Sequence, residues 1–188
     1  QFEDKQIISN SPELFMHSTN LNPVIAHSQP IKGTAKGKDR TSLWLDTKER
    51  AELTMIADLV RNDLGKIAQN GTIFTKARTL RHCGDLLHAE QSVYARLRTE
   101  ITVQELLHAT FPAGSITGAP KKSAMDYIEK LERHDRKLYT GAIGWISSIH
   151  HCHFNVAIRT LFLEDQETHL HVGCGIVYDS DPEKEWDE

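Results

Sequence analysis

The sequence contains no apolar run approaching the roughly 20 residues that a membrane-spanning helix needs. Its 22 Lys and Arg residues are outnumbered by 26 Asp and Glu residues, which gives a formal net charge of −4. This balance argues against nucleic acid or an anionic membrane surface as a partner. The three cysteines, Cys83, Cys152 and Cys174, are few and scattered, so we expect reduced thiols in a cytoplasmic protein rather than a disulfide framework.

Helix patterns are clear in the chain of 188 residues, which is long enough to bury a core. The strongest pattern covers residues 46–64, where Asp46 and Glu49 have the spacing of a capping box. Two more helices are predicted to begin at Thr102 and near Pro120. A short final helix, with Asp181 as its N-cap, is predicted at the end of the sequence.

Strand patterns lie between and after these helices. They cover residues 71–77 and 92–98, a hairpin formed by 139–148 and 154–164 with its turn at 149–153, and a last strand at 168–177. Strands and helices do not alternate as βαβ units. The order of elements therefore predicts an α+β fold rather than a doubly wound parallel sheet.

Four acidic residues are candidates for chemistry. Glu52 lies beside the apolar stripe of the predicted helix 46–64, and Glu185 and Glu188 are spaced i, i+3 on one face of the final helix. If both helices face one cavity, three carboxylates could bind Mg²⁺, which prefers oxygen ligands. The same residues also fit a solvated helix face and an acid cluster at a helix N-terminus. Glu13, which follows a proline near a strand end, equally fits an ordinary loop acid.

Several other segments offer groups to an anion. The run GSITGAPKK, residues 114–122, leads small residues into a helix start, where backbone N–H groups point outward. The run GCG at 173–175 leaves backbone bare for a close approach. Arg159, interpreted as a mid-strand arginine, either reaches solvent or binds an anion. The histidine-rich run 150–153 matches no zinc spacing, and we assign no metal to it.

Lys32 stands in the run QPIKGTA, residues 29–35. Turns rarely need a lysine, and strands bury one reluctantly. The residues alone leave three interpretations open, namely a solvated loop residue, a phosphate clamp or a nucleophile.

Seven segments, taken in order, closely resemble successive blocks of the chorismate-utilising enzymes. They read SPELF, PIKGT, AELTMIADLVRNDLG, TFPAGSITGAPKKSAMDYIEKLE, YTGAIGWIS, AIRT and GCGIVYDSDPEKEWDE. The family includes anthranilate, aminodeoxychorismate, isochorismate and salicylate synthases. The resemblance implies an α+β fold with β-sandwich sheets flanked by helices and an active-site cleft. It also implies that residues 1–188 are the C-terminal portion of a single chorismate-binding domain, without its N-terminal part and final helix.

Within that family, the lysine of PIKGT resembles the aminodeoxychorismate synthases, whereas anthranilate synthases typically have alanine there. The resemblance implies amination of chorismate at C4 through a covalent intermediate on Lys32, for p-aminobenzoate and folate synthesis. It further implies Mg²⁺ as cofactor and a glutamine amidotransferase subunit that supplies ammonia.

The same resemblance implies a role for each candidate site residue. Lys32, Glu13 and His88 correspond to catalytic positions, with Glu13 as the general acid. Glu52, Glu185 and Glu188 correspond to the Mg²⁺ ligands. The positions that contact chorismate are Thr117, Tyr139, Arg159, Gly173 and Gly175.

Two other functions remain open from the sequence. The chain resembles anthranilate synthase component I and the water-using isochorismate and salicylate synthases as well, although Lys32 argues against the first. A non-catalytic chorismate-binding paralogue is the non-enzyme alternative. The retained carboxylates and Arg159 argue against it. The run HAEQSV at 88–93 argues for it, because the family usually has a His-Leu-Val-Ser-like run there and a charged Glu90 requires a partner or solvent.

Overall fold

The computed structural model describes residues 5–36, 40–164, 167–178 and 180–187. The strands are β1 (Gln6–Ser9), β2 (Leu14–Ser18), β3 (Ile25–Gln29), β4 (Ile31–Lys36), β5 (Phe74–Thr75), β6 (Thr79–Cys83), β7 (Leu86–Glu90), β8 (Val93–Arg96), β9 (Ala142–Ser148), β10 (His151–Val156), β11 (Thr160–Glu164) and β12 (Glu167–Leu170). The helices are α1 (Arg40–Leu45), α2 (Thr47–Gly65), α3 (Val103–Thr110), α4 (Lys121–Leu131) and α5 (Pro182–Asp187), with a 3-10 turn at Gly114–Ile116.

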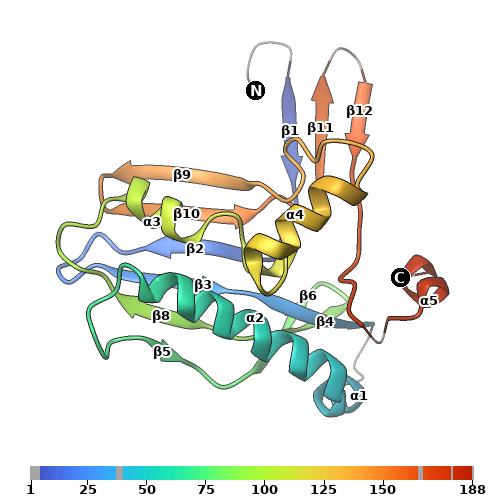
Figure 1. Cartoon of the computed structure of the whole chain (residues 1–188), viewed down its shortest axis with the longest axis horizontal. Coiled ribbons are helices and arrows are strands. Elements are labelled where there is room, and N and C mark those ends of the chain that lie inside the picture. Colours follow the sequence, from blue (N-terminus) through green and yellow to red (C-terminus); the bar gives the residue numbers. More distant parts are fainter. Residues whose placement is uncertain (1–4, 37–39, 165–166, 179, 188) are drawn as a thin grey trace.

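Within these residues the strands form three antiparallel sheets (Figure 1). The largest has the order β5-β8-β3-β2-β10-β9, and two smaller ones have the orders β4-β7-β6 and β1-β11-β12. Antiparallel sheets with helices packed on them confirm the predicted α+β fold.

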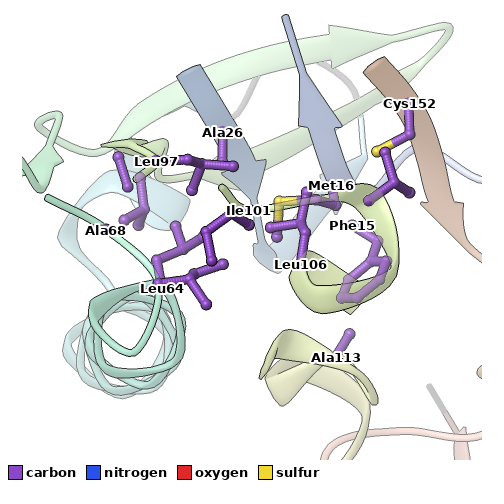
Figure 2. Packing of buried hydrophobic residues seen from close by; sticks show 14 of the residues in the cluster. Phe15, Met16, Ala26, Leu64, Ala68, Leu97, Ile101, Leu106, Ala113 and Cys152 are labelled. Atoms are coloured by element: carbon purple, nitrogen blue, oxygen red, sulfur yellow. The ribbon is translucent and has the colours of Figure 1, made fainter. Parts of the chain in front are cut away.

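The main core lies between the six-stranded sheet and helices α2 and α3 (Figure 2). Met16 and Ala26 point from the sheet toward Leu64 of α2 and Leu106 of α3, and all four side chains are buried. A fully buried leucine of this kind contributes about 1.5–3 kcal/mol to folding. This packing fixes α2 against the sheet that carries the segment around Glu13.

A second, smaller core joins α1 and α2 to the sheet β4-β7-β6. Leu43 and Leu53 pack there on Leu87 and Ala89 of β7. Because side chains alternate along a strand, His88 faces the opposite side of that sheet from its two neighbours. The same helix α2 therefore holds both sheets, and β7 turns its polar face toward the site described below.

The predicted helices are confirmed with their caps. The Asp46 side chain accepts a hydrogen bond from Glu49 N at 2.9 Å at the start of α2. Thr102 and Glu105 form a reciprocal capping box on α3. The final helix begins after Asp181, as expected. In the described residues no helix is long and apolar enough to cross a membrane.

The strand predictions were less accurate. The run 71–77 contributes only Phe74–Thr75, because Gly71 has a positive φ and belongs to a turn. The turn predicted at 149–153 is shorter, since β10 already begins at His151.

The last two predicted strands also differ from the structure. The run 154–164 is divided between β10 and β11, which belong to different sheets. Within the run 168–177, only the residues up to Leu170 pair as a strand. In both places the apolar pattern continues past the point where the chain leaves its sheet.

One row of rings crosses the face of the large sheet that is turned away from α2 and α3. The cross-strand partners, strand by strand, are Trp145, His153, His17, His27, Tyr94 and Phe74. His27 and Tyr94 stack with ring centroids 4.2 Å apart. Burial, followed by the charges of His17, Lys76 and His153, lowers the pKa of His27 to about 4.

We predict that His27 makes stability depend on acid. Its pKa is near 6.5 when unfolded and about 4 when folded, so its contribution is complete above pH 6.5 and is lost as pH falls toward 4. A His27→Phe variant keeps a ring on Tyr94 but has no proton to bind. Thermal melts between pH 7 and 4 should therefore show a flatter decline in Tm for the variant. Parallel Tm curves for the two proteins would contradict this assignment.

Candidate active site

An open cleft of about 1780 Å³, including solvent at its mouth, lies among β4, β7, α2, α4 and the 3-10 turn. It brings together most of the residues selected from the sequence. The predicted site residues that line it are Glu13, Lys32, Glu52, His88, Thr117, Tyr139, Arg159, Gly173 and Gly175. Of the remaining two, Glu185 does not line the cleft and Glu188 lies outside the described residues.

Lys32 projects from β4 into the cleft, and its side chain is only 19% exposed. Its Nζ lies 3.9 Å from Glu52 Oε2 on α2. A Cβ added to Gly175 would lie 2.6 Å from the same Nζ. The lysine is therefore a largely buried amine, paired with a carboxylate and approached closely by bare backbone, which excludes the solvated-loop interpretation.

Glu13 immediately precedes β2, and its carbonyl accepts a hydrogen bond from Val156 N at 3.1 Å. The residue is 5% exposed. Burial raises the pKa of its carboxyl group to about 7, against the opposing effects of a hydrogen bond to Ser115, the charge of Lys32 and the backbone of Ile31. A carboxylic acid with this pKa still carries a proton near neutral pH, which a general acid requires.

His88 is fully buried on β7 and lines the cleft. Its Nδ1 is 2.9 Å from Thr34 Oγ1, whereas its Nε2 has no hydrogen-bond partner among the described residues. Burial, followed by the charges of Arg159 and Arg81, lowers the pKa of the imidazole, so it is neutral. A buried nitrogen without a partner is costly, and a bound ligand could supply the missing contact.

The segments around Tyr139 and Arg159 share an unusual backbone. Arg159 follows β10 rather than lying within a strand, so its interpretation as a mid-strand arginine was wrong. Its φ is 50°, and Lys137 and Thr140 also have positive φ, at 50° and 63°. Thr140 N donates to Ala157 O at 2.9 Å, which joins the two segments. Positive φ at non-glycine residues is uncommon and clusters at functional sites.

Gly173 continues this wall of the cleft. A Cβ added there would lie 2.8 Å from the Tyr139 hydroxyl oxygen. Any larger residue would displace the tyrosine side chain. With Gly175 beside Lys32, the run 173–175 therefore leaves backbone exposed next to two of the candidate residues.

Thr117 ends the 3-10 turn Gly114–Ile116, and its hydroxyl donates to Ala113 O at 3.0 Å. The turn is anchored from behind by Lys121, which donates to Thr110 O at 2.9 Å and Pro112 O at 2.7 Å and also pairs with buried Asp63. This anchoring sets the position of the segment that carries both Thr117 and the Glu13 partner Ser115.

Glu52 and Glu185, two of the three acidic residues expected to bind a metal, lie near the N-terminal end of α2. Glu185 is 3.2 Å from Lys48 Nζ and 2.6 Å from Ser180 Oγ, and these hydrogen bonds lower the pKa of its carboxyl group. Lys48 lies one helical turn before Glu52 and feels both charges. In the described part of the chain no three Asp, Glu, His or Cys side chains form a metal-binding group. The carboxylates of Glu52 and Glu185 fit a hard cation, but here Glu52 is paired with Lys32 and Glu185 with Lys48.

Sequence reasoning missed two residues that support the site. Ser115 hydrogen-bonds the Glu13 carboxyl group, and Arg136 donates to Ile116 O at 2.8 Å while also binding Glu132 through Nε and Nη2. Neither residue has a local signal for this role, because Glu13 and Ile116, the partners that join them to the site, are distant in the sequence. The small-residue run 114–122 was the available pointer to Ser115.

We predict that replacing Glu13 by Gln removes a pH-dependent loss of stability. Unfolded Glu13 ionises near pH 4.5 and folded Glu13 near 7, so its contribution is complete below 4.5 and is lost as pH rises through 7. Relative to the wild type, Glu13→Gln should therefore gain stability between pH 4.5 and 7.5 in urea unfolding. Exposed Glu129→Gln is the control, and an identical profile for both variants would show that Glu13 ionises normally.

Comparison with known proteins identifies the family. The family described as chorismate binding enzyme matches residues 1–188. The chain is 38% identical over 197 residues to anthranilate synthase component 1 of Saccharolobus solfataricus, covering 100% of this chain and 46% of that protein. It is 36% identical over 194 residues to aminodeoxychorismate synthase component 1 of Bacillus subtilis, covering 98% and 41%.

The fold leads to the same family. The crystal structure of anthranilate synthase component I from Streptococcus pneumoniae superposes with a TM-score of 0.88 and 36% identity, covering 99% of this chain and 42% of that one. The chain thus spans less than half the length of these relatives. On both sequence and structure, the protein belongs to the family of chorismate binding enzymes.

Proposed function

We propose that the protein aminates chorismate at C4 to give 4-amino-4-deoxychorismate, with Lys32 as a covalent nucleophile. The observation that carries this proposal is the largely buried Lys32 amine in the same cleft as Glu13, whose pKa is about 7. A nucleophile and an acid that retains its proton are the two groups that such a displacement requires.

The proposed reaction has two balanced displacements. The neutral amine of Lys32 attacks C2 of chorismate, the ring double bond shifts, and the hydroxyl group leaves C4 as water with a proton from Glu13. Ammonia then adds at C4, the double bond shifts back, and the C2–N bond to Lys32 breaks. The lysine leaves as the neutral amine that began the reaction, and the new ammonium group at C4 returns a proton to the Glu13 carboxylate, so the enzyme is regenerated.

Charged groups along the cleft suit the two carboxylates of chorismate. Arg159 can bind a carboxylate through paired N–H groups, while the Tyr139 hydroxyl and the N–H groups of Gly173 and Gly175 can add hydrogen bonds. We propose that His88 uses its unpartnered Nε2 toward the substrate, and that Thr117 shapes the pocket. These assignments give every cleft-lining candidate residue a contact with substrate or a place beside it.

We also propose Mg²⁺ as the cofactor, held by Glu52 and Glu185 together with Glu188. When bound, the cation would neutralise a carboxylate of chorismate. The support is chemical, because carboxylate oxygens are the ligands that Mg²⁺ prefers and two of the three acids lie near Lys48 at one end of α2.

A second activity, anthranilate synthesis, is supported by the comparisons. Most of the similar curated proteins, including those from Lactococcus lactis and Aquifex aeolicus at 38% identity, carry the name anthranilate synthase component 1. Lys32 is the residue that favours amination at C4. The names of the relatives as component 1 support a separate glutamine amidotransferase subunit as the source of ammonia.

We predict that Lys32→Ala abolishes a covalent adduct. Wild-type protein incubated with chorismate but no ammonia should gain the mass of a chorismate-derived group, because the intermediate cannot be released. The variant should bind chorismate, since its other contacts remain, yet lose most C4 amination. Intact-protein mass spectrometry and product analysis measure both. Lys36→Ala, at the exposed end of the same strand, is the control, and unchanged turnover of Lys32→Ala would refute the nucleophile.

We predict that Mg²⁺ stabilises the protein through the acidic residues. At 100 times its Kd a bound cation adds about 2.7 kcal/mol, so Tm should rise with Mg²⁺ in a buffer without substrate. Glu52→Gln and Glu185→Gln should each reduce this rise, whereas Glu183→Gln, an exposed acid on the same short helix as Glu185, should retain it. An equal response in all four proteins would exclude these ligands.

A further inference from the structure

An arginine joins the small sheet to the segment that carries Glu13. Arg81 on β6 donates from Nε to Glu90 Oε2 on β7 at 2.5 Å, and from Nη2 to Pro12 O at 2.7 Å. The Glu90 side chain is 8% exposed and that of Arg81 is 40% exposed. The charged Glu90, which has no obvious place in a strand, therefore has a partner, and that partner continues to the residue before Glu13.

The segment before β2 is otherwise held mainly from the large sheet. Asn155 Nδ2 donates to Ser11 O at 3.2 Å, and Val156 N donates to Glu13 O at 3.1 Å. Both donors lie on β10. Arg81 approaches from a different sheet, β4-β7-β6, which also carries Lys32 and His88.

We propose that Arg81 and Glu90 form a positioning pair that fixes the Glu13 carboxyl group relative to Lys32 and His88. The acid role of Glu13 rests on the proposed function, whereas the positioning itself does not. Arg81 contacts the backbone of Pro12 and not the reacting groups. Its charge also lowers the pKa of His88, so the titration of Glu13, rather than turnover, isolates its effect on the Glu13 segment.

The geometry explains why the pair is an arginine and a glutamate. The planar guanidinium presents donors in fixed directions, so one edge can bind Glu90 while another binds the Pro12 carbonyl. A buried carboxylate needs hydrogen-bond donors, and Arg81 Nε and the Thr79 hydroxyl supply them to Glu90. The carboxylate in turn holds the guanidinium in the orientation that reaches Pro12.

Loss of the Arg81–Glu90 positioning pair should change the pKa of Glu13. The pKa of Glu13 is raised mainly by burial, and burial depends on the segment staying against the sheets. If Arg81 is removed, the segment loosens and water reaches the carboxyl group. The pKa should then fall from about 7 toward the ordinary 4.5, with a shift of roughly one unit or more.

The test is a ¹³C NMR titration of glutamate carboxyl groups in the intact protein, with Glu13 assigned by its absence in Glu13→Gln. Arg81→Ala should lower the Glu13 pKa. Glu90→Gln keeps an oxygen that can accept from Arg81 Nε, so this variant should leave the Glu13 pKa unchanged. The matched control is Arg78→Ala, which removes a guanidinium that binds the carbonyls of Leu43 and Trp44 at 2.7 and 3.1 Å, and it should leave Glu13 unchanged.

A second variant controls for misfolding of Arg81→Ala, in which buried Glu90 keeps only the hydrogen bond from the Thr79 hydroxyl at 3.4 Å. The double variant Arg81→Leu/Glu90→Leu removes both charges together and should fold, yet it lacks the Pro12 contact and should show the same shift. An unshifted Glu13 in either folded variant, an equal shift in Arg78→Ala, or a shift in Glu90→Gln as large as that in Arg81→Ala, overturns the proposal.

Turnover separates this inference from the proposed function. If both hold, Arg81→Ala should lower chorismate amination by about tenfold or more and move the alkaline limit of its pH profile downward with Glu13. Arg81→Lys, which keeps the charge without the fork, should restore part of the rate. A wild-type protein that does not aminate chorismate but shows the expected titrations would refute the function and support the positioning pair.

Discussion

The packing of α2 against two sheets is the constraint on which the rest of the structure depends. Its 19 residues place Leu53 in the core of the small sheet and Leu64 in the core of the large one. Glu52, adjacent to Leu53, is thereby held at the cleft beside Lys32. A single rigid helix thus sets the distance between the sheet that carries Lys32 and the sheet that receives the Glu13 segment, and neither side of the cleft is free to move alone.

Several residues with proposed chemical roles are held in environments or conformations that lower the stability of the folded state. Glu13 is buried at the expense of its ionised form, and His88 keeps a buried nitrogen without a partner among the described residues. Arg159 and Thr140 have positive φ, which costs about 1–3 kcal/mol each. Such strain persists only where surrounding contacts over-determine the conformation. Here Thr140 N donates to Ala157 O, and Arg136 donates to the Thr140 hydroxyl.

Features determined by neighbouring residues were predictable from the sequence, and features determined by distant ones were not. The caps of α2 and α3 depend on residues three apart, so the helices were placed correctly. Arg159 was misplaced because the apolar alternation around it continues although the chain turns there. The resemblance selected residues that prove to line one cleft, but it gave no distances among them, and their roles remain proposals.

The contacts that no pattern predicted join elements from opposite ends of the sequence. Lys48 meets Glu185 and Asn155 meets Ser11 across well over one hundred residues, and Arg81 meets Pro12 across 69. Sequence reasoning could state only that Glu90 required a partner or solvent, because a charge in a strand needs compensation and the sequence does not specify its source. The fold supplies that source on the neighbouring strand. Glu90 departs from the usual family pattern, and its partner Arg81 also binds the carbonyl of Pro12, the residue before the proposed acid Glu13. The role of such a departure therefore becomes clear from the further contacts of its partner.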